Sequence, residues 1–407
     1  MRTRTWCVAM TLLSFGASAT GQTVLSEADA LARLSPDSPR VRAIRASVDL
    51  ARATVLAAAR WPNPRTTFNR ESVAGVTENM VTVTQALPIT GRRSLEVSAA
   101  SALVEASAQR ADEEIRRARA ELRSAYADLV SAQVREAELT GARDRLRALA
   151  DVLARREAAG EAAGYDRLRA EREVMDMEAD RAAARADRAR AQAGVAAFFA
   201  DPGDTTALVA VAPVTAARVP LPTVDMLVAR AQTVRGEPAA LRDEIESARF
   251  AERAAARRVV PEPEVVAGTK SSNLGGGDVG SVLGVFATIP LFDRAQPERA
   301  MARARLAQAE ARGVAFQTSL AAQIGGLHAL VAERREAADR YRAASTTSAT
   351  ELERIAQVSY DDGERGILEL LDAYRSGAAA RTRQAALDTA VRQAEIELEF
   401  VSGWEMQ

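Results

Sequence analysis

The sequence predicts a mainly α-helical protein with a small β part, built from two copies of a long helical hairpin. Three observations lead to this prediction. The chain of 407 residues repeats itself, each copy contains a long helical pattern, and each copy has two short segments with strand character. Length alone suggests two or three domains, but a repeat of this kind favours two halves that build one joint body.

The repeat rests on three pairs of similar segments. Their anchor residues are a proline, a second proline and a glycine, at offsets of 199, 202 and 203 residues. The pairs are 57–64 with 254–263, 85–89 with 287–291, and 160–161 with 363–364. Because the offset drifts so little, we infer one ancestral unit that was duplicated, with small changes in its loops.

Composition excludes several classes of function. Hydrophobic residues make up 47% of the chain but aromatic residues only 4%, which suits long solvated helices packed through small side chains. The 54 basic and 55 acidic residues give a net charge of −1, so nothing favours nucleic-acid binding. No Ser-His-Asp set, glycine-rich phosphate loop or Cys-His pair is present. We therefore expect no enzyme activity and no cofactor.

The first residues have the pattern of a secretory signal peptide, which we assign to residues 1–21. Two arginines precede an apolar run over residues 6–15, and Ala17-Ser18-Ala19 suggests cleavage after Ala19. A retained anchor helix is the alternative, although the run is short for one. Cys7 is the only cysteine and lies in this segment, so the mature chain would have no disulfide.

The first repeat is assigned to residues 22–205. Its expected elements are a helix, two strands, a long helix and a shorter helix, over 26–59, 65–74, 79–87, 92–157 and 165–199. Prolines close the first helix, and Gly160 makes the turn between the last two. Large apolar residues recur in the long helix at steps typical of helices packed along their length, namely Ile115, Leu122, Tyr126, Leu129, Leu139, Leu146, Leu149 and Leu153.

The second repeat, residues 223–403, follows a linker assigned to 206–222. Its elements come in the same order, over 223–258, 264–270, 279–289, 294–358 and 366–401, with Gly363 at the turn. In its second strand, Leu283 and Val285 would share one face while Gly280 and Gly284 share the other.

The helix lengths fit a common body. At about 1.5 Å per residue, the helix over 92–157 is roughly 100 Å long. The helices over 26–59 and 165–199, placed end to end, nearly match it. We therefore expect two stacked shorter helices beside one long helix in each repeat.

Four strands per chain limit how this protein could meet a membrane. Open sheet edges cannot lie in lipid, because each unpaired backbone group there costs several kcal/mol. Closed membrane barrels begin at about eight strands. If the strands enter a membrane, several copies must share one barrel, and three copies would supply twelve strands.

With these features in place, the chain resembles the outer-membrane efflux proteins of the TolC family. The resemblance rests on the duplicated order of elements, on Pro62-Asn63-Pro64 before the strands, and on the turns at Gly160 and Gly363. It implies a homotrimer with a shared twelve-stranded β-barrel in the Gram-negative outer membrane, continued by an α-helical barrel through the periplasm. It also implies two partners, a periplasmic adaptor and an inner-membrane transporter, and a passive role as their exit duct.

Within that family, two segments are most similar to the heavy-metal efflux branch, which serves cation pumps of the resistance-nodulation-division type. They are 87–93 (LPITGRR) and 290–294 (PLFDR). Many relatives in that branch carry a lipid-modified cysteine or an N-terminal extension. This chain shows neither, so its anchoring and its substrate stay open.

The family's periplasmic gate maps onto the turn after residue 360. Tyr360 and Arg365 match the tyrosine and arginine that hold the closed state, and Glu369 and Asp372 match two acids around the aperture. Residues three apart share a helix face, so threefold symmetry would make a ring of carboxylates that attracts cations. The alternative is an ordinary solvated helix face. The turn at Gly160 has no matching acid pair.

Other residues have simpler interpretations. Trp61 and Phe292 flank the strands and could belong to an interfacial aromatic belt or pack at the junction with the helices. His328, the only histidine, sits among apolar residues and is interpreted as a packed helix position. The mature chain has no cluster of metal-ligating residues, so metals would pass through water-filled space.

Two alternative functions remain at this point. One is an outer-membrane duct for drugs or for type I protein secretion. The other is a soluble periplasmic coiled-coil adaptor. Adaptors also carry long helical hairpins, but usually one hairpin between β-rich domains, whereas this chain has two hairpins and few strands.

Overall fold

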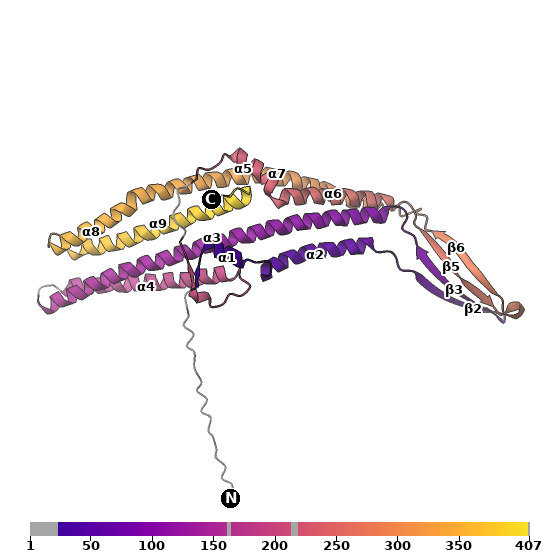
Figure 1. Ribbon diagram of the computed structural model, residues 1–407, viewed down its shortest axis with the longest axis horizontal. Coiled ribbons are helices and arrows are strands. Elements are labelled where there is room, and N and C mark those ends of the chain that lie inside the picture. Colours follow the sequence, from indigo (N-terminus) through magenta and orange to yellow (C-terminus); the bar gives the residue numbers. More distant parts are fainter. Residues whose placement is uncertain (1–22, 161–163, 213–218, 406–407) are drawn as a thin grey trace, which may run out of the picture.

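The computed structural model describes residues 23–160, 164–212 and 219–405. The chain forms a long, narrow helical body with a small β-sheet projecting from one end (Figure 1). The expected signal peptide, residues 1–21, lies outside the described residues, as does Glu161 of the first turn.

The two halves of the chain repeat one order of elements. The first half contains β1 (Thr23–Leu25), α1 (Glu27–Arg33), α2 (Pro39–Ala59), β2 (Arg65–Val73), β3 (Val76–Ala86), α3 (Arg92–Ala158) and α4 (Gly164–Ala196). The second contains β4 (Leu208–Ala210), α5 (Val224–Val234), α6 (Gly236–Arg257), β5 (Pro263–Ser272), β6 (Val279–Ala287), α7 (Gln296–Tyr341), α8 (Thr347–Asp361) and α9 (Ile367–Ser402). Short 3₁₀ turns lie at Thr205–Ala207 and Leu274–Gly276.

Helix α3 is the central element of the body. Helix α2 packs along the half nearer the sheet and α4 along the other half, as the length argument predicted (Figure 1). Helices α6 and α9 of the second half pack on the same helix, so the two repeats share one body. Of the apolar residues that predicted α3, only Ile115 is half-buried; the others, from Leu122 to Leu153, are buried. Gly141 does not interrupt the helix.

The projecting sheet has the order β2-β3-β5-β6 and is antiparallel throughout. A tight turn joins β2 to β3, with positive φ at Ala74 and Gly75 (49° and 82°), as two-residue hairpin turns require. Strands β3 and β5 join the hairpins of the two repeats. Strand β2 is as polar as its sequence suggested. It is held in the sheet by its pairing with β3 over its whole length.

The helix expected over 26–59 is broken, which corrects the sequence prediction. Helix α1 ends at Arg33, and α2 begins at Pro39 after an N-cap in which Ser38 Oγ accepts a hydrogen bond from Val41 N (3.3 Å). Pro36 and Pro39 each lack a backbone N–H, so a continuous helix would lose two hydrogen bonds here. Ser38 is fully buried, so the break is packed within the body.

The helix expected over 223–258 is also broken. Helix α5 ends before Arg235, which is extended (φ −74°, ψ 140°), and α6 begins at Gly236. The ring of Pro238 would clash with the carbonyl of Val234 in a continuous helix. The break turns the Arg235 side chain into the core, where it is only 8% exposed.

The segment assigned as a linker, 206–222, contains an element that the sequence analysis missed. Strand β4 pairs in parallel with β1, from Thr23 with Leu208 to Leu25 with Ala210. The Tyr126 hydroxyl of α3 lies within hydrogen-bond distance of Leu25 O (2.8 Å) and Val211 O (2.7 Å) and shares its one proton between them. These contacts hold the beginning of the described chain against the middle of the body.

The helix expected over 294–358 is interrupted as well. A π-helical turn over Arg342–Thr346 separates α7 from α8, whereas α3 is continuous throughout its length. The two repeats therefore differ in their long helices.

Candidate functional site

The ends of the two hairpins lie together at the end of the body remote from the sheet (Figure 1). Each hairpin turns at a glycine with positive φ, Gly160 at 77° and Gly363 at 72°, a conformation that other residues adopt at a cost. In the second turn, Ser359 O accepts hydrogen bonds from Glu364 N (2.8 Å) and Arg365 N (3.1 Å). This end of the second hairpin, residues 357–375, is called the tip below.

The structure does not join Tyr360 to Arg365 within one chain. Tyr360 is half-buried against the apolar core of the tip, and the Arg156 guanidinium of α3 lies 5.8 Å from its ring centroid. Arg365 is exposed, and no hydrogen bond or ion pair links the two residues. A closed state held by both residues would need each of them to bond to a different partner.

Glu369 and Asp372 lie one turn apart on α9, as predicted, and both are exposed. Asp372 forms an ion pair with Arg375 (3.3 Å), which leaves most of its surface in solvent. Glu369 is in the first turn of α9, where a negative charge also stabilises the helix dipole.

Tyr374 is a tip residue that the sequence analysis missed. Its side chain is buried, and its hydroxyl donates a hydrogen bond to Gln357 Oε1, which joins α9 to α8. The Arg145 guanidinium of α3 lies 5.6 Å from its ring centroid. Its spacing from Ile367 and Leu370 could have placed it on the buried face.

Arginines connect the first long helix to the second hairpin. Arg381 of α9 forms ion pairs with Glu138 of α3 (2.6 Å) and Glu353 of α8 (2.9 Å). Arg145 also approaches Glu353 (3.9 Å). These ion pairs lie beside an apolar core that the two hairpins share near the tip, which includes Leu146, Leu153 and Leu370.

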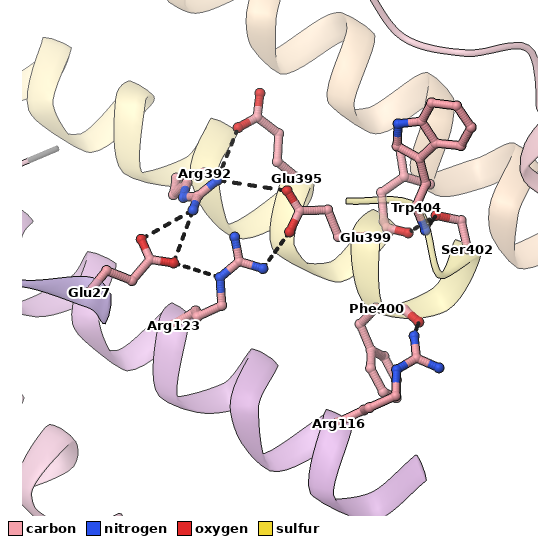
Figure 2. A network of polar contacts seen from close by, with 10 residues as sticks. Glu27, Arg116, Arg123, Arg392, Glu395, Glu399, Phe400, Ser402 and Trp404 are labelled. Atoms are coloured by element: carbon pink, nitrogen blue, oxygen red, sulfur yellow. Dashed lines mark hydrogen bonds and ion pairs between the residues drawn. The ribbon is translucent and has the colours of Figure 1, made fainter. Parts of the chain in front are cut away.

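Farther from the tip, a denser charged network joins four helices, and Figure 2 shows much of it. Arg123 of α3 donates to Glu27 of α1 (2.6 Å) and to Glu399 of α9. Arg392 of α9 donates to both oxygens of Glu27 (3.1 Å). Glu395 in turn pairs with Arg335 of α7 (2.7 Å). No spacing rule within the sequence could have predicted this network, because its members lie on four different helices.

This network should make the fold sensitive to acid. Burial opposes ionisation of Glu27, but Arg392 and Arg123 outweigh it, so the pKa of Glu27 lies below its ordinary value. A carboxylate with a lowered pKa stabilises the folded state above about pH 4.3 and loses this effect as the pH falls below it. Glu27→Gln should therefore cost about 2 kcal/mol at pH 7 and much less at pH 3.

Thermal unfolding followed by circular dichroism between pH 7 and pH 3 checks this expectation. Asp49→Asn, which alters an exposed ion pair with Arg52 on α2, is the matched control and should change stability by less than about 0.5 kcal/mol. If the difference in stability between wild type and Glu27→Gln stayed the same from pH 7 to pH 3, the expectation would be contradicted.

The two faces of the sheet differ in chemistry. Residues directly opposite each other on neighbouring strands point to the same side, so the register assigns every side chain to a face. One face, called the apolar face below, carries most of the exposed large apolar side chains together with Arg70; the apolar ones are Phe68, Val81, Val83, Val265, Val279, Leu283 and Val285. The opposite face, the polar face, carries the ion pairs Arg65–Glu264 (3.3 Å) and Lys270–Glu78 (2.6 Å), and also exposed Val73 and Phe286.

The remaining predicted residues have ordinary surroundings. The Arg93 guanidinium lies 5.5 Å from the ring of the half-exposed Trp61, and Phe292 is 94% exposed. His328 Nε2 lies 3.1 Å from Pro222 O, a contact that fits a packed helix position. Among the described residues, no group of three or more His, Cys, Asp and Glu side chains could hold a metal ion.

Among the described residues, one helical stretch has the length and composition of a membrane span. It lies within residues 296–361, has a mean hydropathy of 1.2 and is 22% buried. A single stretch of this kind is weak evidence for a span, and α7 packs against α6 and α9.

Comparison with known proteins identifies the fold. No family model and no curated protein sequence matches the chain. Solved structures do match it: CusC, described in terms of transmembrane channel formation (16% identity, 93% of this chain and 92% of that chain, TM-score 0.76); the outer membrane protein VceC of Vibrio cholerae (15%, 94% and 97%, 0.74); and the MtrE outer membrane channel of Neisseria gonorrhoeae in its open state (16%, 93% and 88%, 0.74). Over nearly its whole length, the chain has the fold of outer-membrane channel proteins.

Proposed function

We propose that this chain is one third of a trimeric exit duct in the Gram-negative outer membrane. The observation that carries the proposal is the sheet, which projects beyond the helical body with one apolar and one polar face. In a barrel shared by three copies, the apolar face would contact lipid and the polar face would line water. Exposed Phe68, Leu283 and Val285 on one sheet face are unfavourable in water, which counts against a soluble adaptor.

A trimer would pair the two sheet edges that are unpaired in a single chain. Strands β2 and β6 are the two edges of the sheet, and unpaired edges are excluded from lipid. Three copies joined edge to edge give the twelve-stranded barrel. Helix α7 supports contact between copies, because residues 313–332 contain no charged side chain and expose mainly small ones. Small uncharged surfaces allow helices to approach closely.

The tip is proposed to be the gate. Tyr360 and Arg365 would hold it closed through bonds to neighbouring copies, since they do not contact each other within one chain. Glu369 and Asp372 from three copies would place six carboxylates around the aperture. Such a ring concentrates cations, which agrees with heavy-metal cations as the substrate. The cations would cross in water, and the family resemblance supplies the choice of metals.

The proposed partners are a periplasmic adaptor and an inner-membrane transporter of the resistance-nodulation-division type. A groove of about 430 Å³ between the two hairpins would accept a helix of the adaptor. Its lining includes apolar Leu139, Met177 and Ala378, and more basic than acidic side chains, namely Arg135, Arg375 and Arg383 against Asp180. This combination favours an amphipathic helix with acidic flanks.

Reconstitution in planar lipid bilayers tests the proposal. The purified protein should be a trimer by native mass spectrometry and should form cation-selective channels. Glu369→Ala with Asp372→Ala should shift the reversal potential toward that of a non-selective pore and weaken block by multivalent cations. Glu351→Ala, an exposed acid on α8 paired with Arg354, is the control and should leave selectivity unchanged.

Two outcomes would contradict the proposal. Recovery of a monomer in the soluble periplasmic fraction would favour the adaptor function. An unaltered reversal potential in the Glu369→Ala, Asp372→Ala variant would rule out the acidic ring as the source of selectivity, but it would not rule out the duct.

A further inference from the structure

The π-helical turn between α7 and α8 is a difference between two otherwise similar repeats. It occupies Arg342–Thr346. The stretch 203 residues earlier, 139–143, is regular α-helix in α3, even though it contains Gly141. The fold that the two repeats share therefore does not require an interruption of the long helix at this position. A π turn holds one extra residue in a wider, weaker turn, and such turns are frequent at functional sites.

Polar contacts from α9 hold the π turn. Gln384, which is buried, donates to Ala338 O (3.4 Å) where the regular ladder of α7 ends, and to Asp388 Oδ1 (3.0 Å). Arg342 donates to Asp388 and to Asp339 (2.9 Å for the latter). The turn is thus fixed by hydrogen bonds that can be exchanged, rather than by interdigitated apolar side chains.

This arrangement leaves one buried group unsatisfied. Gln384 Oε1 has no hydrogen-bond partner within the described part of the chain. A buried acceptor without a partner costs about 1–3 kcal/mol, so the present position of the turn is less stable than full pairing would make it. An arrangement in which the turn moves or closes could recover that cost.

The position of the turn separates a fixed part of the second hairpin from its tip. On the sheet side, Arg392 and Glu399 of α9 are tied to Glu27 and Arg123, as described above. On the other side lie α8 and the tip residues of the proposed gate. In the first hairpin, the described residues contain no such turn, and the sequence after Gly160 has no acid pair that matches Glu369 and Asp372.

We propose that the π turn over Arg342–Thr346 is the flexure about which α8 and the tip move when the gate opens. The proposal rests on the gate function assigned to the tip above. It places the bend of the second hairpin at a defined position, whereas α3 is continuous at the equivalent position.

A matched pair of single-residue deletions tests whether the turn holds an extra residue. Deleting Ala344 should convert the π turn to an α turn without changing which face of α8 is buried, so the melting temperature should fall by only a few degrees. Gly141 occupies the equivalent place in α3. Deleting it should rotate the rest of α3 by about 100° and expose Leu146 and Leu153, with loss of the folded protein. Equal damage from both deletions would overturn the proposal.

Conductance then tests the motion. The Tyr360→Phe, Arg365→Ser variant is expected to leak ions, and the same variant without Ala344 should leak at least tenfold less, because α8 can no longer bend. An undiminished leak would overturn the flexure while leaving the gate intact. If the gate variant itself does not leak, the gate assignment fails.

If the gate variant does not leak, hydrogen exchange still tests whether the π turn is a flexure. Backbone amides of 342–350 should exchange at least tenfold faster than those of 139–147 in the wild-type trimer, since a weaker turn opens more often. Equal exchange rates would overturn the flexure whatever the duct conducts.

Discussion

Replacing Glu113 by alanine should lower the free energy of unfolding by about 3–5 kcal/mol, because it leaves a buried guanidinium without its partner. Arg235, at the break between α5 and α6, donates through Nε (2.8 Å) and Nη2 (2.6 Å) to Glu113 Oε1. The two side chains are only 7% and 8% exposed. Gly236 N also donates to Glu113 Oε2 (3.3 Å), so the backbone at the start of α6 loses a bond as well.

The measurement is chemical denaturation of the detergent-solubilised protein, with Glu114→Ala as control. Glu114 is the next residue on α3 and is exposed, so its loss should change stability by less than about 0.5 kcal/mol. The double variant Glu113→Leu, Arg235→Met removes both charges and should recover most of the loss. Equal effects of Glu113→Ala and Glu114→Ala would show that the ion pair does not stabilise the fold.

Replacing Tyr360 by phenylalanine together with Arg365 by serine should open the duct. Phenylalanine keeps the packing of the Tyr360 ring against the tip core and its contact with Arg156, so only the hydroxyl is lost. Arg365 is exposed in the single chain, so its loss removes contacts between copies rather than support within one. Loss of even 1.4 kcal/mol from the closed state raises the open population tenfold, and three copies lose these groups at once.

Single-channel recording in lipid bilayers checks this result as an increase of at least tenfold in open probability. Arg354→Ser is the control, since Arg354 lies on α8 in an exposed ion pair with Glu351, away from the turn. Unchanged open probability in the double variant would rule out these two residues as the gate.

Much of the fold followed from local patterns in the sequence. The spacing from Leu122 to Leu153 predicted the buried face of α3, and the prolines and glycines predicted the ends of the hairpins. The mainly helical fold with a small sheet, predicted from the repeat, the long helical patterns and the short strand segments, agrees with the solved channel structures. These features depend on residues close in sequence, or on a whole-chain order that the repeat made visible.

The features that the sequence did not predict depend on distant contacts. Strand β4 is three residues long and forms only because β1 lies beside it. The extended Arg235 is held by Glu113, and Glu27 is placed by arginines from α3 and α9. The π turn leaves no apolar signature, because its neighbours Gln384 and Asp388 are polar. At the tip, the sequence predicted the residues but not that Tyr360 and Arg365 lie apart within one chain.

The pairing of β3 with β5 has a consequence for synthesis of the protein. When the first repeat has been made, β3 has its partner β2 on one side and nothing on the other, and it waits for β5 from the second repeat. An exposed strand edge is a template for pairing with other chains. A chain truncated between the repeats would therefore be prone to aggregate.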